Sequence, residues 1–96
     1  MNRVHKLKTL NQYFNDVVSG IKTFEIRKED DKIFNIGDEL ELHRYTDEYG
    51  YVYLDGDFLV ETDENGSDKV SVVVTYKTSY AQNSPYVVLG IKLKQP

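Results

Sequence analysis

Apolar residues near the N-terminus follow the spacing of a helix. They recur at i, i+3, i+4, i+7 and i+8 and so form one stripe on a helix surface: Leu10, Tyr13, Phe14, Val17 and Val18. Thr9 and Gln12 have the spacing of a capping box, and Gly20 stands where a left-handed residue commonly ends a helix. The pattern predicts a helix from Leu10 to about Ser19.

Most of the remaining chain alternates apolar and polar residues, which is the period of a β-strand. Strands are predicted over the ranges 4–8, 21–28, 39–45, 51–54, 58–60, 70–77 and 87–93. A strand, one helix and then a run of further strands is typical of an α+β domain. We expect a small β-barrel or a curved mixed sheet of about five or six strands, with one main N-terminal helix.

The same alternation predicts which side chains share a face of each strand. In the range 39–45, Leu40 and Leu42 are predicted to face the core and His43 to face water, together with the neighbouring glutamates. In the range 21–28, one face carries two apolar residues, Phe24 and Ile26, and the other carries Thr23, Glu25 and Arg27. Two turn signals predict hairpins, Asp55-Gly56-Asp57 and the stronger Asn65-Gly66.

Composition narrows the class of protein without indicating an activity. The chain has 96 residues, of which 40% are hydrophobic and 29% charged, so we expect one globular domain over 1–96. It has no apolar run near the ~18 residues of a membrane helix, and its first residues lack the apolar stretch of a signal peptide. We therefore expect a cytoplasmic protein without a membrane partner. The absence of cysteine excludes disulfides, thiolate zinc sites and thiol catalysis.

Charge is distributed unevenly along the chain. Residues 1–32 carry a net charge of +2, residues 33–68 of −10 and residues 69–96 of +4, which sum to −4. A negative total argues against non-specific coating of nucleic acid through bulk charge. It leaves room for a local basic cleft formed by the two ends of the chain.

One short segment concentrates candidate chemistry. Glu25 and Arg27 are two residues apart on a predicted strand, so a carboxylate can orient a guanidinium on one face, and Lys22 adds a mobile charge. The arrangement can bind a phosphate or a base edge. Such pairs are also common as ion pairs on half-exposed strands, and spacing alone favours that simpler interpretation.

A helix, a G-x-K-T-x-E-x-R segment, a polar loop and a G-D turn follow one another along the first half of the chain. The residues concerned are His5-Lys6-Leu7-Lys8, Tyr13-Phe14, Gly20-Ile21-Lys22-Thr23-Phe24-Glu25-Ile26-Arg27-Lys28 and Phe34-Asn35-Ile36-Gly37-Asp38. Together they resemble the ASCH domain of the PUA-like superfamily, in particular the small bacterial and phage ASCH-related proteins of domain-of-unknown-function family 3850. The resemblance is good over 4–44 and looser over 70–93.

The resemblance implies a single PUA-like domain with a cleft beside the turn from helix to strand. In ASCH relatives this cleft is proposed to bind RNA or a nucleotide-like ligand. The residues carried over as a ligand-binding site are Lys8, Lys22, Thr23, Glu25 and Arg27. Lys22 and Arg27 would contact phosphate or a base edge, and Glu25 would hold Arg27 or accept from an exocyclic amine.

Some ASCH relatives are enzymes, so a nucleoside amidohydrolase or a ribonuclease is the alternative. The amidohydrolase type resembles a K-x-x-T pattern with a downstream glutamate. Here Glu25 stands in place of the threonine nucleophile, and residues 69–96 contain no Asp or Glu. Lys22, Thr23 and Glu25 are the catalytic candidates, and we favour binding without catalysis.

The acidic region 45–69 supports a second alternative, a phage or mobile-element accessory protein that binds a host protein through this face. Its tyrosines at 49, 51 and 53 can stack unpaired bases or, more commonly, pack across strands. Because carboxylates repel phosphate, we expect the region to lie on the far side from the site.

No cofactor and no metal are expected. His5 and His43 lack partners at ligand spacing and are interpreted as hydrogen-bonded structural residues. Glu29-Asp30-Asp31 lacks the spacing of a calcium loop and is interpreted as a solvated loop. The expected partner is RNA or a nucleotide-like ligand, and the protein is expected to be a monomer.

Overall fold

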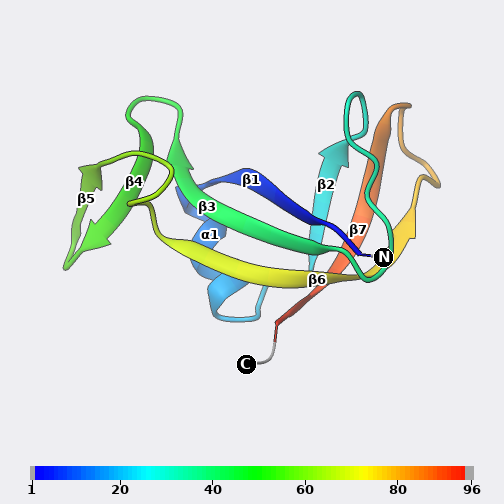
Figure 1. The fold of residues 1–96 in the computed structure, drawn as a ribbon, viewed down its shortest axis with the longest axis horizontal. Helices are drawn as coiled ribbons and strands as arrows, with labels where there is room; N and C mark the ends of the chain where they lie inside the picture. The colour runs from blue at the N-terminus through cyan, green and yellow to red at the C-terminus, as the bar shows by residue number, and fades with distance from the viewer. Residues whose placement is uncertain (1, 95–96) are drawn as a thin grey trace.

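The computed structural model describes residues 2–94, which form a curved, open sheet with one short helix (Figure 1). The elements are β1 (Val4–Leu10), α1 (Asn11–Val18), β2 (Phe24–Lys28), β3 (Glu39–Thr46), β4 (Gly50–Asp55), β5 (Phe58–Glu61), β6 (Lys69–Thr78) and β7 (Tyr86–Leu93). The strands follow the order β2-β7-β6-β3-β4-β5, and β1 pairs in parallel with β3. The predicted curved mixed sheet with an N-terminal helix is confirmed; it is open rather than a closed barrel, and it has seven strands.

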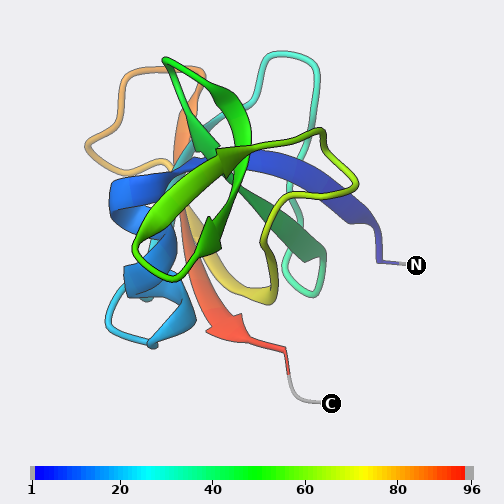
Figure 2. The ribbon, with the colours of Figure 1, turned by 90° about the vertical axis from the view of Figure 1, so that its left-hand side faces the viewer.

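The sheet curls until two of its edges approach one another. Within the described residues, β2 pairs only with β7, and β1 pairs only with β3. Each of these two strands therefore has one edge along which no other strand is paired. Arg27 reaches from β2 to the β1 edge, where its Nη2 donates to the carbonyl oxygen of Lys8 at 3.1 Å. We call the space between β1 and the segment 24–35 the seam. Figure 2, seen from the β4–β5 end, shows α1 beside this curved sheet.

The core lies inside the curl and is built mainly from alternate residues of the long strands, with one residue each from α1 and from the loop after β2. It contains Val17, Phe34, Leu40, Leu42, Val72, Val74, Val87, Leu89 and Ile91. The inward orientation predicted for Leu40 and Leu42 is confirmed, since both side chains are fully buried. Across 2–94, no helix is both long enough and apolar enough to span a membrane.

The helix is predicted in the right place, but its start is wrong. α1 covers Asn11–Val18, Leu10 occupies the N-cap position, and no side chain caps the helix, so the capping box of Thr9 is not formed. Thr9 instead ends up buried in β1, where its hydroxyl accepts a hydrogen bond from Arg27. The hydrogen bond from the distant Arg27 therefore forms in place of the predicted N-cap of the helix.

One of the two predicted hairpins is confirmed, and the prediction of the other is wrong. β4 and β5 pair around Asp55-Gly56-Asp57 as predicted. The segment around Asn65-Gly66 is a loop rather than a hairpin, because β5 pairs with β4, whereas β6 pairs with β3 and β7. β2 also begins at Phe24 rather than near residue 21.

Two polar residues expected in water are buried or paired. His43 is 1% exposed and contacts Ser67 Oγ at 2.8 Å and Glu41 Oε2 at 2.7 Å, so the prediction that it faces water is wrong. Glu29 does not belong to a solvated loop, since its carboxylate accepts from the Phe34 amide and from Lys77 Nζ, at 2.8 and 2.7 Å. Partners from distant segments replace water in both cases.

A buried arginine attaches the helix to the sheet. The guanidinium of Arg44 on β3 donates to the side-chain oxygens of Asn11 and Asn15, at 2.7 and 2.9 Å. It also donates to Asp68 at 2.8 Å and lies 4.3 Å from the centre of the Phe14 ring. This one side chain therefore holds α1, β3 and the loop before β6 together.

Replacing Arg44 with alanine should lower the free energy of unfolding by about 2 kcal/mol, because its charge-assisted hydrogen bonds are lost. The loss is smaller than for a fully buried pair, since the Asp68 left behind keeps partial access to water. Urea unfolding followed by circular dichroism measures the change. Arg3→Ala is the matched control, since the Arg3 side chain is exposed, and it should change stability by less than about 0.5 kcal/mol. Equal effects of the two variants would contradict this role of Arg44.

Candidate functional site

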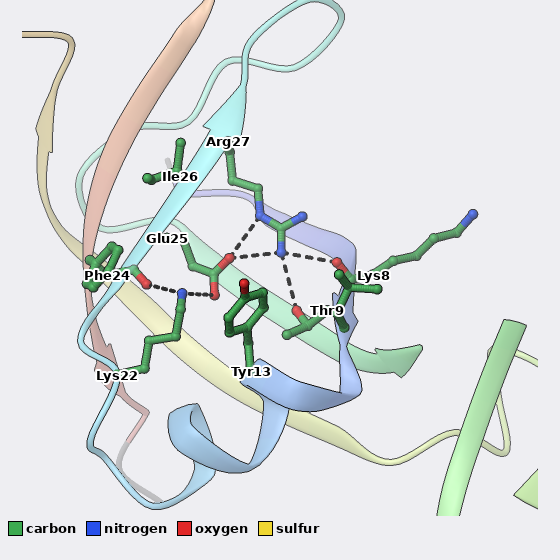
Figure 3. A pocket seen from close by; sticks show the side chains of 9 residues that line it. Lys8, Thr9, Tyr13, Lys22, Phe24, Glu25, Ile26 and Arg27 are labelled. Atoms are coloured by element: carbon green, nitrogen blue, oxygen red, sulfur yellow. Dashed lines mark hydrogen bonds and ion pairs between the residues drawn. The ribbon is translucent and has the colours of Figure 1, made fainter. Parts of the chain in front are cut away.

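A cavity of about 390 Å³ opens at the seam, between the end of β1, the start of α1 and β2 (Figure 3). It is lined by Lys8, Thr9, Leu10, Tyr13, Lys22, Phe24, Glu25, Ile26 and Arg27. Its volume is in the range of small-molecule sites, which is about 300–1,000 Å³. The cavity can therefore hold a ligand the size of a nucleoside.

A buried carboxylate lies at the centre of the polar wall. Glu25 is only 4% exposed, and its Oε1 accepts from Lys22 Nζ at 3.2 Å. Its Oε2 accepts from Arg27 Nε at 3.0 Å and forms an ion pair with Arg27 Nη2 at 2.9 Å. The ion pair of the simpler interpretation is present, but its carboxylate is buried rather than at the surface, because the curl of the sheet turns this face of β2 toward the seam.

The hydrogen bonds leave some polar capacity for a ligand. A carboxylate has about four lone-pair sites, and the hydrogen bonds from Lys22 and Arg27 use two of those on Glu25, which leaves one on each oxygen. The ammonium of Lys22 has three donors and gives one to Glu25 and one to the carbonyl of Phe24. At Glu25 Oε1 and Lys22 Nζ, one acceptor and one donor therefore remain side by side, with two cations around a single anion.

Apolar and aromatic surface forms the other walls. Tyr13 and Phe24 are each 45% exposed, and Leu10 and Ile26 are also exposed. The ammonium of Lys22 lies 4.7 Å from the centre of the Phe24 ring and 5.7 Å from that of Tyr13. Such contacts favour a fixed position for the cation. The cavity thus offers rings to a flat ligand and polar groups to its edge.

A comparison with known protein families matches residues 4–91 to a family described as "Domain of unknown function (DUF3850)". The chain belongs to the DUF3850 family. Among curated proteins, no match is found. The family description assigns no activity, and the matched range contains every residue that lines the cavity.

In this DUF3850 chain, four of the five predicted site residues line the cavity, namely Lys8, Lys22, Glu25 and Arg27. Thr23 does not. It lines a separate cavity of about 280 Å³ on the other side of Lys22, and its carbonyl accepts from the amide of Ile91. Thr23 lies before β2, which begins at Phe24, so the strand alternation that predicted it on the same face as Glu25 does not extend to it.

Lys8 belongs to the rim rather than to the polar wall. Figure 3 shows its side chain directed away from Glu25 and Arg27. Its ammonium lies 4.8 Å from the centre of the Tyr45 ring and 5.8 Å from that of Tyr51. The prediction that region 45–69 lies on the far side is therefore wrong for these two tyrosines.

Sequence reasoning missed five residues of this DUF3850 cavity. They are Thr9, Leu10, Tyr13, Phe24 and Ile26. A signal was present, because the apolar stripe of the helix is wider than the core requires. Only Phe14 and Val17 of α1 are buried, and Tyr13 is left to line the cavity.

The remaining candidates have structural roles in the DUF3850 fold. Tyr51 packs across the strand pair on Tyr45, with ring centres 5.4 Å apart and planes at 82°, as the cross-strand interpretation predicts. His5 contacts Asp38 at 2.9 Å, so its interpretation as a hydrogen-bonded structural residue is confirmed, as it is for His43. Within 2–94, no group of three or more His, Cys, Asp or Glu side chains is placed to hold a metal ion.

Proposed function

We propose that the seam cavity binds a nucleotide, free or as one unit of RNA, without catalysing a reaction on it. The observation that carries this proposal is the pairing of exposed aromatic surface with a buried carboxylate held between two cations. Bases stack on aromatic side chains, and arginine and lysine bind phosphate. The site combines both requirements in one nucleoside-sized cavity.

The remaining polar capacity suggests which part of the ligand contacts Glu25. The open lone pair on Oε1 would accept from an exocyclic amine, as carboxylates do for cytosine. The remaining donor of Lys22 would reach an adjacent carbonyl or a phosphate oxygen. We therefore expect a base with an amine next to an acceptor to bind better than one without an amine.

The order of elements supports a finer assignment to the ASCH type of the PUA-like superfamily. A first strand, a short helix and a strand that carries G-x-K-T-x-E-x-R lead into an open curved sheet, and the cavity lies at that turn. This is the arrangement that the resemblance implies.

Catalysis is less well supported than binding. Thr23, a candidate nucleophile, lines a different cavity from Glu25 and Arg27. The threonine that lines the site is Thr9, which is 3% exposed and whose hydroxyl faces the guanidinium of Arg27 rather than a base. A nucleophilic hydroxyl needs an adjacent general base.

The test is an amide chemical-shift titration of labelled protein with CMP, UMP, a short single-stranded RNA and a stem-loop at low salt. The proposal predicts shifts that cluster on 8–10, Tyr13 and 22–27, with CMP, which carries an exocyclic amine, binding more tightly than UMP. Shifts confined to the acidic region 45–69, or no shifts with any of the four, would contradict it. The second result would favour a protein partner instead.

A further inference from the structure

The seam contains a second cavity, at the opposite end of β1 from the first. It has a volume of about 380 Å³ and lies between the start of β1 and the loop that follows β2. Arg3, His5, Lys32 and Asn35 are among the residues that line it, together with the exposed side chain of Ile33. Nothing in the proposed function accounts for this cavity.

Side chains from the opposite side of the seam connect the two cavities. Arg27 Nη2 donates to the carbonyl of Lys8, and Lys32 Nζ lies 3.4 Å from the carbonyl of Lys6. Alternate carbonyls of a strand point to the same side, so both lie on the edge of β1 that faces the seam. The two cavities thus lie along one continuous strand edge.

Several of the cations that line the two seam cavities have no carboxylate partner among the described residues. In the part of the chain that the structure describes, five of the lysines and arginines have no carboxylate within 4.0 Å: Arg3, Lys8, Lys32, Lys69 and Lys92. Three of the five, Arg3, Lys8 and Lys32, line the two seam cavities. One carboxylate, Asp31, lines the second cavity. Cations without an internal partner remain available to phosphates.

We propose that the second cavity is a subsite for the same ligand, which is therefore a single-stranded oligonucleotide lying along β1 rather than a mononucleotide. This inference rests on the proposed function of the first cavity. From Arg3 to Lys8 a strand covers about 17 Å at ~3.3 Å per residue, which is longer than one nucleotide can bridge. Arg3 and Lys32 would contact backbone phosphates between and beyond the two cavities.

The test is a length series of single-stranded oligocytidylates with one, two, four and eight nucleotides. Affinity is measured by titration at several salt concentrations, with amide shifts recorded for each length. Shifts from CMP should stay at the first cavity, and those from the longer chains should extend to 3–5 and 31–35. Affinity should rise with length up to about the span of the seam.

A pair of charge-matched variants assigns the effect to the second cavity. Arg3→Gln combined with Lys32→Gln should weaken octamer binding on the order of tenfold at ~0.1 M salt, and lower the slope of log K against log salt by about 1.4. CMP affinity should not change. Lys69→Gln combined with Lys92→Gln removes the same charge elsewhere and should leave both affinities nearly unchanged.

The possible results separate the two proposals. If no ligand of any length binds, the proposed function fails, and this inference fails with it. If CMP binds but length and the Arg3/Lys32 variant have no effect, the inference alone is overturned. Equal weakening by both double variants would indicate attraction by total charge and would also overturn it.

Discussion

Replacing Asp38 with alanine should lower the free energy of unfolding by about 4 kcal/mol, a large part of the ~5–14 kcal/mol by which domains of this size are stable. The Asp38 carboxylate is 2% exposed and has three partners. Its Oδ1 accepts from the amide of Arg3 at 3.0 Å, and its Oδ2 from His5 Nε2 at 2.9 Å and the amide of Asn35 at 3.0 Å. Alanine leaves these buried and partly buried donors without an acceptor.

Urea unfolding of the variant measures the loss. Asp57→Ala is the matched control, since Asp57 is an exposed aspartate in the β4–β5 turn, and it should change stability by less than about 0.5 kcal/mol. If Asp38→Ala unfolds at the urea concentration of the control, Asp38 does not hold β1 to the turn before β3.

The same contacts predict how stability depends on pH. Burial raises the pKa of Asp38, but the hydrogen bonds from His5 and from the amides of Arg3 and Asn35 outweigh it and hold the pKa below the ordinary aspartate range. The unfolded chain therefore takes up this proton first as pH falls. The stabilisation is fully present above the ordinary pKa of about 3.9 and is lost as pH falls through the lowered value. The acid-induced loss of stability should be smaller in Asp38→Ala.

Replacing Tyr13 with alanine should weaken nucleotide binding by about 5- to 150-fold, the range that corresponds to about 1–3 kcal/mol per stacked base. Tyr13 is 45% exposed and lines the cavity, so the change removes wall surface rather than core. Stability should fall by less than about 1 kcal/mol. Titration of the folded variant with CMP, alongside urea unfolding, measures both quantities.

Tyr76→Ala is the matched control for binding. Tyr76 is a tyrosine of similar exposure, 61%, on β6, and it does not line either seam cavity. Its replacement should leave CMP affinity unchanged. Equal affinities of Tyr13→Ala and the unaltered protein would show that the base does not stack on this wall.

The variant Arg27→Ala is a poor test of whether Arg27 contacts the ligand, although Arg27 lies in the middle of the motif. Arg27 is the partner of the buried Glu25 and also donates to Lys8 and Thr9 on β1. Removing one member of such a pair leaves a buried charge without compensation, which costs about 3–5 kcal/mol when both are fully buried. A loss of binding in this variant would thus combine a lost contact with a loosened seam.

Local pattern was sufficient for the elements of the fold. Alternation placed Leu40 and Leu42 in the core, and the spacing of Phe14 and Val17 placed the buried side of the helix. The motif around Lys22 and Arg27 marked the polar wall of the cavity, because residues two apart on a strand share a face. These are short-range relations, which a sequence displays directly.

Long-range partners decided the rest. Thr9 does not cap the helix as predicted, because its hydroxyl accepts from the guanidinium of Arg27. Asn65-Gly66 lies in a loop rather than a hairpin turn, because the strands on either side of it pair with other strands. His43 is buried because Ser67 supplies a partner 24 residues away. Each outcome depends on which distant group arrives at the same place, and no local spacing reports that.

The sequence by itself therefore determined a curved sheet with one helix and the chemical groups of one strand face. The tertiary structure decided that Glu25 on this face is buried, that β1 lies across the seam from it, and that Tyr13 and Phe24 complete the walls of the cavity. The physical reason is the curl of the sheet. It brings two edges together that are not adjacent in the sheet, and the cavities lie where those edges meet without pairing.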